Sequence, residues 1–432
     1  MILANSTRTL MATAVWLSLA SAWMFVVAAP AEAQAPTRAQ RAAMTDTTSR
    51  SDSTTLVVLG VDHSTQLLAR SYHPGYLRAF FDRVQPAALC IERSPEEFAR
   101  GDHYEFTYEV QHVAVPYARA HGIQLCPIDW LPSRDDERLA FGRVEVVEIP
   151  AVRVARGFQG FLTLDSAALG RTLFYGESEQ SRSEVRGFYD RPRAAGWPDF
   201  PRRLGLYRTF MQAMRIRAAL RVNPGRTLLV VVGTMHKDDI EGVLSGEPML
   251  RIVQPSTFGL PTPEVAAGRL EDVDLAAILS FNLLGVQPLE GPVDWPWVGE
   301  VLERFARAHP EAPELPLLRQ RHAVLTKRAT PAVAAASYER IAATVDSAAT
   351  FRFTGVEDTR RVDCYFDPFG NLRVRQRALV EAAREWTRAG RPENAERLRK
   401  ALMRDGAWSP LRSAQLAAYW ERYIAAPVAH GR

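Results

Sequence analysis

The sequence predicts an α/β fold, in which helices flank a mostly parallel central sheet and a helical C-terminal region follows. Between residues 55 and 260, short apolar runs recur that are typical of strands buried on both faces. Amphipathic stretches with helical spacing separate these runs, as in right-handed strand–helix–strand crossovers. After residue 261 strand signals become rare and helical periodicity dominates.

The composition is that of a globular protein with a large core. Hydrophobic residues make up 47% and charged residues 24% of the 432 residues. A chain of this length excludes a small disulfide-rich fold, and its composition excludes a mostly disordered chain and a polytopic membrane protein. The net charge is only +4, from 53 basic and 49 acidic residues. This balance predicts no nucleic-acid partner.

The N-terminal residues 1–35 are predicted to be an export signal. Arg8 supplies a short positive region, a long apolar run follows, and two small-x-small cleavage sites lie within 31–35. Because the apolar run approaches the length of a membrane-spanning helix, an uncleaved anchor is the alternative. Residues 36–54 are polar and have no apolar period, which predicts a disordered tether. The protein is therefore expected to be periplasmic or extracellular.

Strands and helices are predicted to alternate along an α/β domain at 55–260. The strands are expected at 56–59, 87–91, 123–128 and 228–232, and the helices at 74–84, 104–121, 204–220 and 238–244. The stretch 131–200 is rich in Arg, Gly and Pro and is predicted to be irregular. Long loops of this kind often have a function, here as a substrate wall or lid.

The region 261–432 is predicted to be helical, and the sequence does not indicate its function. Residues 389–395 resemble the turn of a tetratricopeptide hairpin, but no second copy of that repeat follows. These helices could present a surface to a protein partner.

The three cysteines are too few for a disulfide framework. Cys90 and Cys126 both lie in predicted strands, so we expect them to be small buried core residues. Export would also permit a disulfide between them. Cys364 has no candidate partner.

Several common catalytic motifs are missing from the sequence. There is no phosphate-binding P-loop, no G-x-S-x-G nucleophile elbow, no H-E-x-x-H zinc helix and no Rossmann glycine fingerprint. A typical α/β-hydrolase, a zincin protease and a dinucleotide-binding enzyme are therefore not expected.

One motif occurs twice, each time at the end of a predicted strand. LVVLGVDH ends at His63, and LVVVGTMH ends at His236. In each copy a glycine lets the chain turn sharply after the strand. The histidine then stands beyond the carboxyl end of the strand, where open α/β sheets bind their ligands. Two copies in one sheet predict that both histidines belong to one site.

Acidic residues follow two other predicted strands and are expected at the same edge of the sheet. Glu92 comes directly after the second strand, where it could be a metal ligand or a general base. An ion pair with Arg93 or Arg100 is the alternative. Asp129 follows the third strand, where a turn or cap role is equally open. Arg93, Asp129 and Trp130 are the candidates for substrate binding.

The order and spacing of these motifs resemble the TraB/TIKI superfamily. That group includes TraB- and GumN-like proteins, the TIKI proteases, erythromycin esterases and the haem-binding ChaN proteins. The resemblance covers about residues 55–255 and implies an erythromycin esterase/ChaN-like sheet. It also implies a site made of both GxxH histidines, a Glu, and an Arg on the helix before the second GxxH. In this chain the matching residues are His63, Glu92, His236 and Arg208.

The chain departs from the family pattern at one place. The family often has an Arg four or five residues past the Glu, whereas this chain has Glu96 and Glu97 there. Arg93 or Arg100 would have to take that role.

Two functions from different classes are compatible with these residues. The first is an exported hydrolase of a peptide or small-molecule ester. His63, Glu92 and His236 would hold a divalent ion such as Zn, Mn or Co, or would act directly as acid–base groups. Arg208 would stabilise an oxyanion or clamp a substrate carboxylate. The alternative is a non-catalytic protein that binds haem, a metal ion or a peptide on the same fold.

A cluster of ionisable residues with weaker support as a functional site lies on the helix predicted before the third strand. Glu105, Glu109 and His112 share one face of that helix. They could form a second shell around a metal, although a solvated helix face is the favoured interpretation. His73, just before Pro74, is expected to cap a helix rather than to cover the site.

Overall fold

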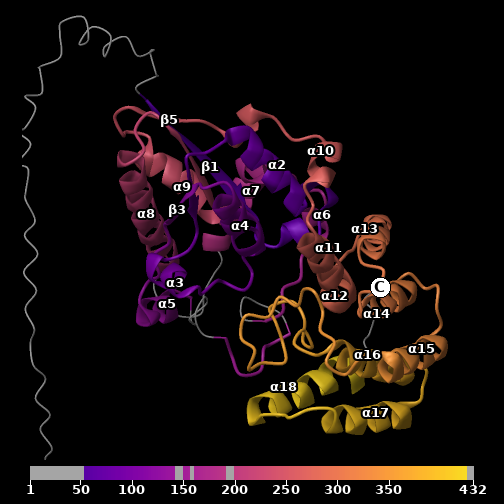
Figure 1. The fold of residues 1–432 in the computed structure, drawn as a ribbon. Helices are drawn as coiled ribbons and strands as arrows, with labels where there is room; N and C mark the ends of the chain where they lie inside the picture. Colours follow the sequence, from indigo (N-terminus) through magenta and orange to yellow (C-terminus); the bar gives the residue numbers. More distant parts are fainter. Residues whose placement is uncertain (1–52, 142–148, 156–159, 191–198, 426–432) are drawn as a thin grey trace, which may run out of the picture. The chain divides into compact units, whose positions relative to one another are not determined.

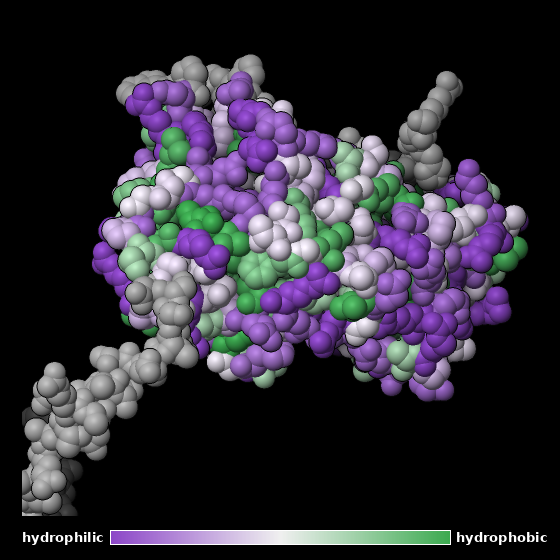
Figure 2. Space-filling model, turned by 90° about the horizontal axis from the view of Figure 1, so that it is seen from above, coloured by the Kyte–Doolittle hydropathy of each residue, from purple (hydrophilic) through white to green (hydrophobic). Residues whose placement is uncertain are grey.

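The computed structural model describes residues 53–141, 149–155, 160–190 and 199–425. The predicted export signal and nearly all of the predicted tether lie outside these residues. Within the described ranges, no helix combines the length and apolar character needed to cross a bilayer. All the described residues belong to one structural unit. Seen from above, most of the surface is hydrophilic and hydrophobic residues gather in only a few places (Figure 2).

A five-stranded parallel sheet forms the centre of the fold, which confirms the predicted α/β class (Figure 1). Its order is β3-β2-β4-β1-β5. The strands are β1 (Thr54–Val61), β2 (Ala88–Ile91), β3 (Gln124–Pro127), β4 (Thr227–Gly233) and β5 (Leu250–Ile252). The first four lie within two residues of their predicted ends. The sequence prediction missed β5, because its three residues include an arginine and are only partly buried.

Helices cross between the strands as the alternation predicts. The crossovers contain α2 (Pro74–Val84), α3 (Pro95–Arg100), the π-helical turn η3 (Glu109–Ala114) with α4 (Val115–Ala120), α8 (Phe200–Arg221) and α9 (Thr234–Leu244). The helix predicted at 104–121 therefore begins later than expected. In contrast, α9 begins four residues earlier than predicted, directly after β4. His236 consequently lies in the first turn of a helix.

The stretch predicted to be irregular contains several short helices. They are α5 (Arg134–Phe141), α6 (Ser166–Leu169), η4 (Tyr175–Glu177) and α7 (Glu179–Tyr189). Two further single turns, η1 (Thr65–Leu67) and η2 (Arg70–Tyr72), follow β1. Side chains of Ser178 and Asp165 cap α7 and α6, and such polar caps are easily read as loop residues in a sequence.

The region after residue 261 is helical, as predicted. After η5 (Pro255–Phe258) it contains α10 (Pro263–Gly268), α11 (Asp272–Leu279), η6 (Ser280–Leu284), α12 (Gln287–Glu290), α13 (Trp295–Ala308), α14 (Leu315–Leu325), α15 (Pro331–Thr344), α16 (Val374–Arg388), α17 (Pro392–Arg404), α18 (Pro410–Trp420) and η7 (Glu421–Ala425). Residues 389–391 join α16 to α17, and residues 392–395 form the first turn of α17. One continuous apolar core contains residues from both sides of residue 261, among them Leu77 and Phe305.

Cys90 and Cys126 form a disulfide between β2 and β3. The expectation of two unpaired core cysteines is therefore wrong. The two residues are direct partners in the parallel register, with Cα atoms 4.3 Å apart, which is close enough for a disulfide. The sequence places both residues in strands but does not specify this register. Cys364 is buried and unpaired.

Candidate functional site at the carboxyl edge of the sheet

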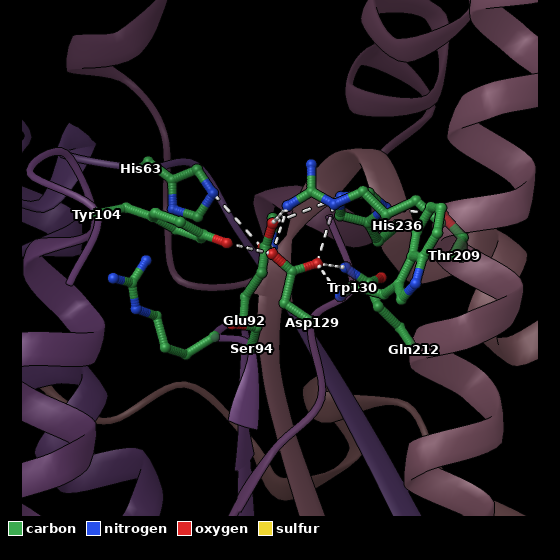
Figure 3. Close-up of polar contacts among 12 residues, drawn as sticks. His63, Glu92, Ser94, Tyr104, Asp129, Trp130, Thr209, Gln212 and His236 are labelled. Carbon is green, nitrogen blue, oxygen red and sulfur yellow. Dashed lines mark hydrogen bonds and ion pairs between the residues drawn. The ribbon is translucent and has the colours of Figure 1, made fainter. Parts of the chain in front are cut away.

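The topology brings the predicted site residues together at one edge of the sheet. All strands are parallel, and β2, β4 and β1 are neighbours, so the chain leaves them on the same side. His63 follows β1, Glu92 follows β2, and His236 stands one turn into α9, which follows β4. Glu92 lies between the two imidazoles, and Arg208 reaches it from α8 (Figure 3). The repeated GxxH pattern therefore marks one site.

Glu92 is the centre of this site. Its Oε2 accepts the backbone N–H of Gly233 at 2.6 Å, and its Oε1 accepts Arg208 Nη2 at 3.1 Å. His236 Nε2 lies 3.4 Å from Oε1, and His63 Nε2 lies 3.7 Å from Oε2. Burial alone would raise the pKa of Glu92, but His236, His63 and Arg208 outweigh it and hold that pKa well below its usual range. Glu92 is thus an ionised carboxylate whose ion-pair partner is Arg208, and neither Arg93 nor Arg100.

Both imidazoles direct Nε2 toward Glu92, because a second partner binds Nδ1 of each ring. Thr209 donates its hydroxyl hydrogen to the carbonyl of Gly205 at 2.9 Å, so its oxygen accepts a hydrogen bond from His236 Nδ1 at 2.7 Å. His63 Nδ1 lies 2.7 Å from Glu109 Oε1 and donates to it. Such partners on the outer ring nitrogen set the tautomer and the orientation of a histidine.

Glu109 is a site residue that the sequence interpretation placed wrongly. Its carboxylate is completely buried and also accepts Gln66 Nε2 at 2.6 Å, so the expected solvated helix face is wrong for this residue. Burial lowers the pKa of His63, but Glu109, Glu92 and Asp62 more than compensate and raise it to about 9. The sequence offered one sign that Glu109 is buried. Its neighbours on the predicted helix include the apolar residues Val110 and Val113.

The other two members of that predicted cluster do not join the site in the same way. Glu105 pairs with Arg153, and the His112 ring packs against Tyr108 and Phe353. His73 occupies the N-cap position of α2, but its side chain makes no capping hydrogen bond, and its ring stacks against Trp297 rather than facing the site.

Asp129 positions Arg208 instead of facing a ligand. It is completely buried, and its two oxygens accept Arg208 Nε at 2.9 Å and Arg208 Nη2 at 2.7 Å. The hydroxyl of Tyr104 and the amide of Gln212 each donate to it at 2.7 Å. Burial opposes ionisation, but Arg208 keeps the pKa of Asp129 below its usual value. The carboxylate therefore fixes the guanidinium beside Glu92.

A cavity of about 570 Å³ opens on this network. His63, Glu92, Arg93, Arg208 and His236 all line it, whereas Asp129 and Trp130 do not. The Trp130 ring packs edge-on against Tyr207, with ring centroids 4.9 Å apart. The structure thus separates the three predicted substrate-binding residues and leaves only Arg93 facing the cavity.

Arg93 is a buried cation with one unused donor. Its side chain lies over the Tyr104 ring, 4.0 Å from the centroid, and its Nε donates to the carbonyl of Asp102. Its Nη1 lies 3.4 Å from Glu97 Oε2 but makes no hydrogen bond. Nη1 is itself inaccessible to solvent, although the Arg93 side chain lines the cavity.

The residue types at the site are suitable for binding a metal ion, but their arrangement is less suitable. Two His and one Glu form a common zinc set. Within the ranges that the structure describes, however, no group of three or more His, Cys, Asp or Glu side chains is arranged to hold an ion. Glu92 explains this, because both its oxygens are engaged by Arg208 and by the N–H of Gly233. A metal ion would have to displace or share these contacts.

Comparisons with protein-family models, with curated proteins and with solved structures find no match for this chain. The resemblance to the TraB/TIKI superfamily consequently stays a prediction.

Proposed function

We propose that this protein is an exported hydrolase that cleaves a peptide or an ester at the carboxyl edge of its sheet. The observation that carries the proposal is the pair of imidazoles around Glu92. Each has its Nδ1 held by a second partner and its Nε2 directed to the carboxylate beside the cavity. Such fixed orientation is what acid–base catalysis requires.

In the proposed reaction His236 is the general base. In the neutral form of His236, Nδ1–H is committed to Thr209 and the lone pair lies on Nε2, which accepts a proton from the attacking water. The water oxygen bonds to the carbonyl carbon, and the carbonyl oxygen becomes an oxyanion. When the intermediate collapses, the bond to the leaving group breaks and His236 returns the proton to it. Glu92 keeps the resulting imidazolium paired throughout.

Arg208 and His63 provide the positive charge for the oxyanion. Asp129 and Glu92 hold Nε and Nη2 of Arg208, and in the described part of the chain its Nη1 makes no hydrogen bond. His63 stands at the other oxygen of Glu92, where it can hydrogen-bond the same carbonyl oxygen. Donors fixed in advance around a developing oxyanion account for a large share of catalysis in acyl transfer. Arg93, whose side chain lines the cavity, would bind an acceptor on the substrate.

A divalent ion such as Zn, Mn or Co, if the protein binds one, would be held by His63, Glu92 and His236. Its contribution would be to lower the pKa of a bound water and to polarise the scissile carbonyl.

Two observations support action outside the cytoplasm, and a third supports the resemblance to the TraB/TIKI group. The N-terminal residues have the pattern of an export signal, and the Cys90–Cys126 disulfide suits an oxidising compartment. The fold also gathers His63, His236 and the remaining motif residues into one site, which supports the resemblance. A protein partner on the C-terminal helices stays a prediction.

The test combines activity with metal analysis of the purified full chain. We expect hydrolysis of p-nitrophenyl esters, and we expect His236→Ala to lower kcat/KM by roughly 10²–10⁴-fold, the usual effect of losing a general base. His121→Ala removes an exposed histidine and is the matched control. Metal content, measured in both variants, shows whether His236 also binds an ion.

Two results would overturn the proposal. Activity that survives both His63→Ala and His236→Ala would remove the imidazoles from the reaction. Absence of hydrolysis, together with a Soret band or stable peptide binding in the purified protein, would favour the alternative role in binding haem, a metal ion or a peptide.

A further inference from the structure

The cavity has an apolar wall beside His63. Phe106, Leu162, Leu164 and Tyr365 all line it, together with the catalytic groups described above. The Phe106 ring meets the His63 imidazole edge-on, with ring centroids 5.3 Å apart. The proposed acid–base network uses none of these four side chains.

Hydrogen bonds of the backbone hold this wall against the catalytic edge. Ser64, the neighbour of His63, donates its hydroxyl to the carbonyl of Phe106 at 2.8 Å and lies 3.4 Å from the Tyr365 hydroxyl. The N–H of Leu162 donates to the carbonyl of Tyr365 at 2.7 Å. The wall is therefore part of the same rigid assembly as His63.

The helical C-terminal region supplies and braces part of this wall. Tyr365 lies between α15 and α16 and is only 4% exposed. Gln287, at the start of α12, accepts the N–H of Leu164 at 2.8 Å and donates to its carbonyl at 3.0 Å. Residues far apart in the sequence thus complete one cavity. The region after residue 261 is in this way part of the candidate site.

We infer that this wall binds a bulky apolar group attached to the scissile carbonyl, and that Tyr365 is a specificity-determining residue. The substrate is then a peptide or ester with a large uncharged acyl group. The inference rests on the proposed function, in which His63 binds the carbonyl oxygen. A group on the same carbonyl carbon would lie against the wall next to His63. Burial of each added methylene favours the transition state by about fourfold.

Esters of one leaving group and two acyl lengths test this inference in the full chain. Wild type should hydrolyse p-nitrophenyl hexanoate with a kcat/KM at least about tenfold above that for the acetate. Tyr365→Ala and Leu164→Gln should each lower this ratio by about fivefold or more. Tyr365→Phe keeps the ring and should keep the ratio.

Leu260→Gln is the matched control for Leu164→Gln, because Leu260 is 43% exposed and lies outside the cavity. Thermal melts show whether each variant is folded. Equal hydrolysis of both esters by wild type, or an unchanged ratio in both folded wall variants, would overturn the inference and leave the proposed function intact. Failure to hydrolyse either ester above the level of His236→Ala would overturn the proposed function itself, and the inference with it.

Discussion

Two of the networks of buried arginines and carboxylates in this protein differ in what surrounds them. The first joins Glu92, Asp129 and Arg208 at the edge of the sheet. The second lies among the C-terminal helices and consists of Arg321, Arg377, Arg384, Asp367, Glu381 and Glu385. In both, arginines hold a buried carboxylate ionised. Burial opposes this for Glu381, but Arg321, Arg384 and Arg377 lower its pKa to about 2.

The difference between them shows that a depressed carboxylate pKa does not by itself mark a catalytic site. The edge network faces a cavity and includes two imidazoles. The C-terminal network is sealed, since Arg321 and Arg377 are each 1% exposed, and none of its six residues lines the cavity at the sheet edge. The edge network is therefore accessible from a cavity, whereas the C-terminal network lies sealed between helices.

The sealed network should give the largest effect on stability. Glu381→Gln leaves three buried guanidinium groups with one compensating charge fewer, so the free energy of unfolding should fall by about 3–5 kcal/mol. Urea unfolding measures this. Glu396→Gln, which removes an exposed carboxylate from an ion pair with Arg399, should cost less than about 1 kcal/mol. An equally small effect of both variants would show that the sealed network does not stabilise the fold.

Substitutions next to the edge network should change the hydrolytic activity. Glu109→Gln removes the charge that orients His63, and kcat/KM should fall by roughly 10–100-fold, as for other residues that support a catalytic histidine. In a His63→Ala background the same change should have almost no further effect, because its target is gone. Additive losses in the double variant would mean that Glu109 acts through folding alone.

Part of the pH dependence of stability in mildly acidic solution should come from His73, which lies outside both networks. His112, whose pKa burial likewise lowers to about 4, should add a contribution of the same sign. Burial, assisted by the charge of Arg304, lowers the pKa of His73 to about 4. The unfolded chain, with a histidine pKa of about 6.5, therefore binds more protons between pH 6.5 and 4, and stability falls as the pH falls through that range. Glu381 contributes little above pH 5, because its stabilising effect is lost only as the pH falls from the unfolded glutamate pKa of about 4.3 to its folded pKa of about 2.

The expected loss from His73 is about 2 kcal/mol between pH 7 and pH 5. Urea unfolding at both pH values should show that His73→Gln loses less stability on acidification than wild type does. An identical loss in the two proteins would assign the pH dependence to other groups.

Much of this protein can be read from its sequence. Apolar runs that end in Gly-x-x-His predict buried parallel strands and place His63 and His236 beyond their carboxyl ends. Because parallel strands deliver their carboxyl ends to one edge, the pattern places both histidines and Glu92 at the same edge, and the strand order then makes them neighbours. Such local signals depend only on the residues next to one another in the chain.

Only the tertiary structure decided which side chains complete and surround the site. Glu109 supports His63, Asp129 holds Arg208, and Tyr365 closes the cavity from far along the chain. The pairing of Cys90 with Cys126 likewise depends on strand register. No periodic pattern in the sequence predicts these contacts, because each one joins residues that are far apart in the chain. The sequence determined the edge at which the candidate site lies, and packing determined the cavity around it.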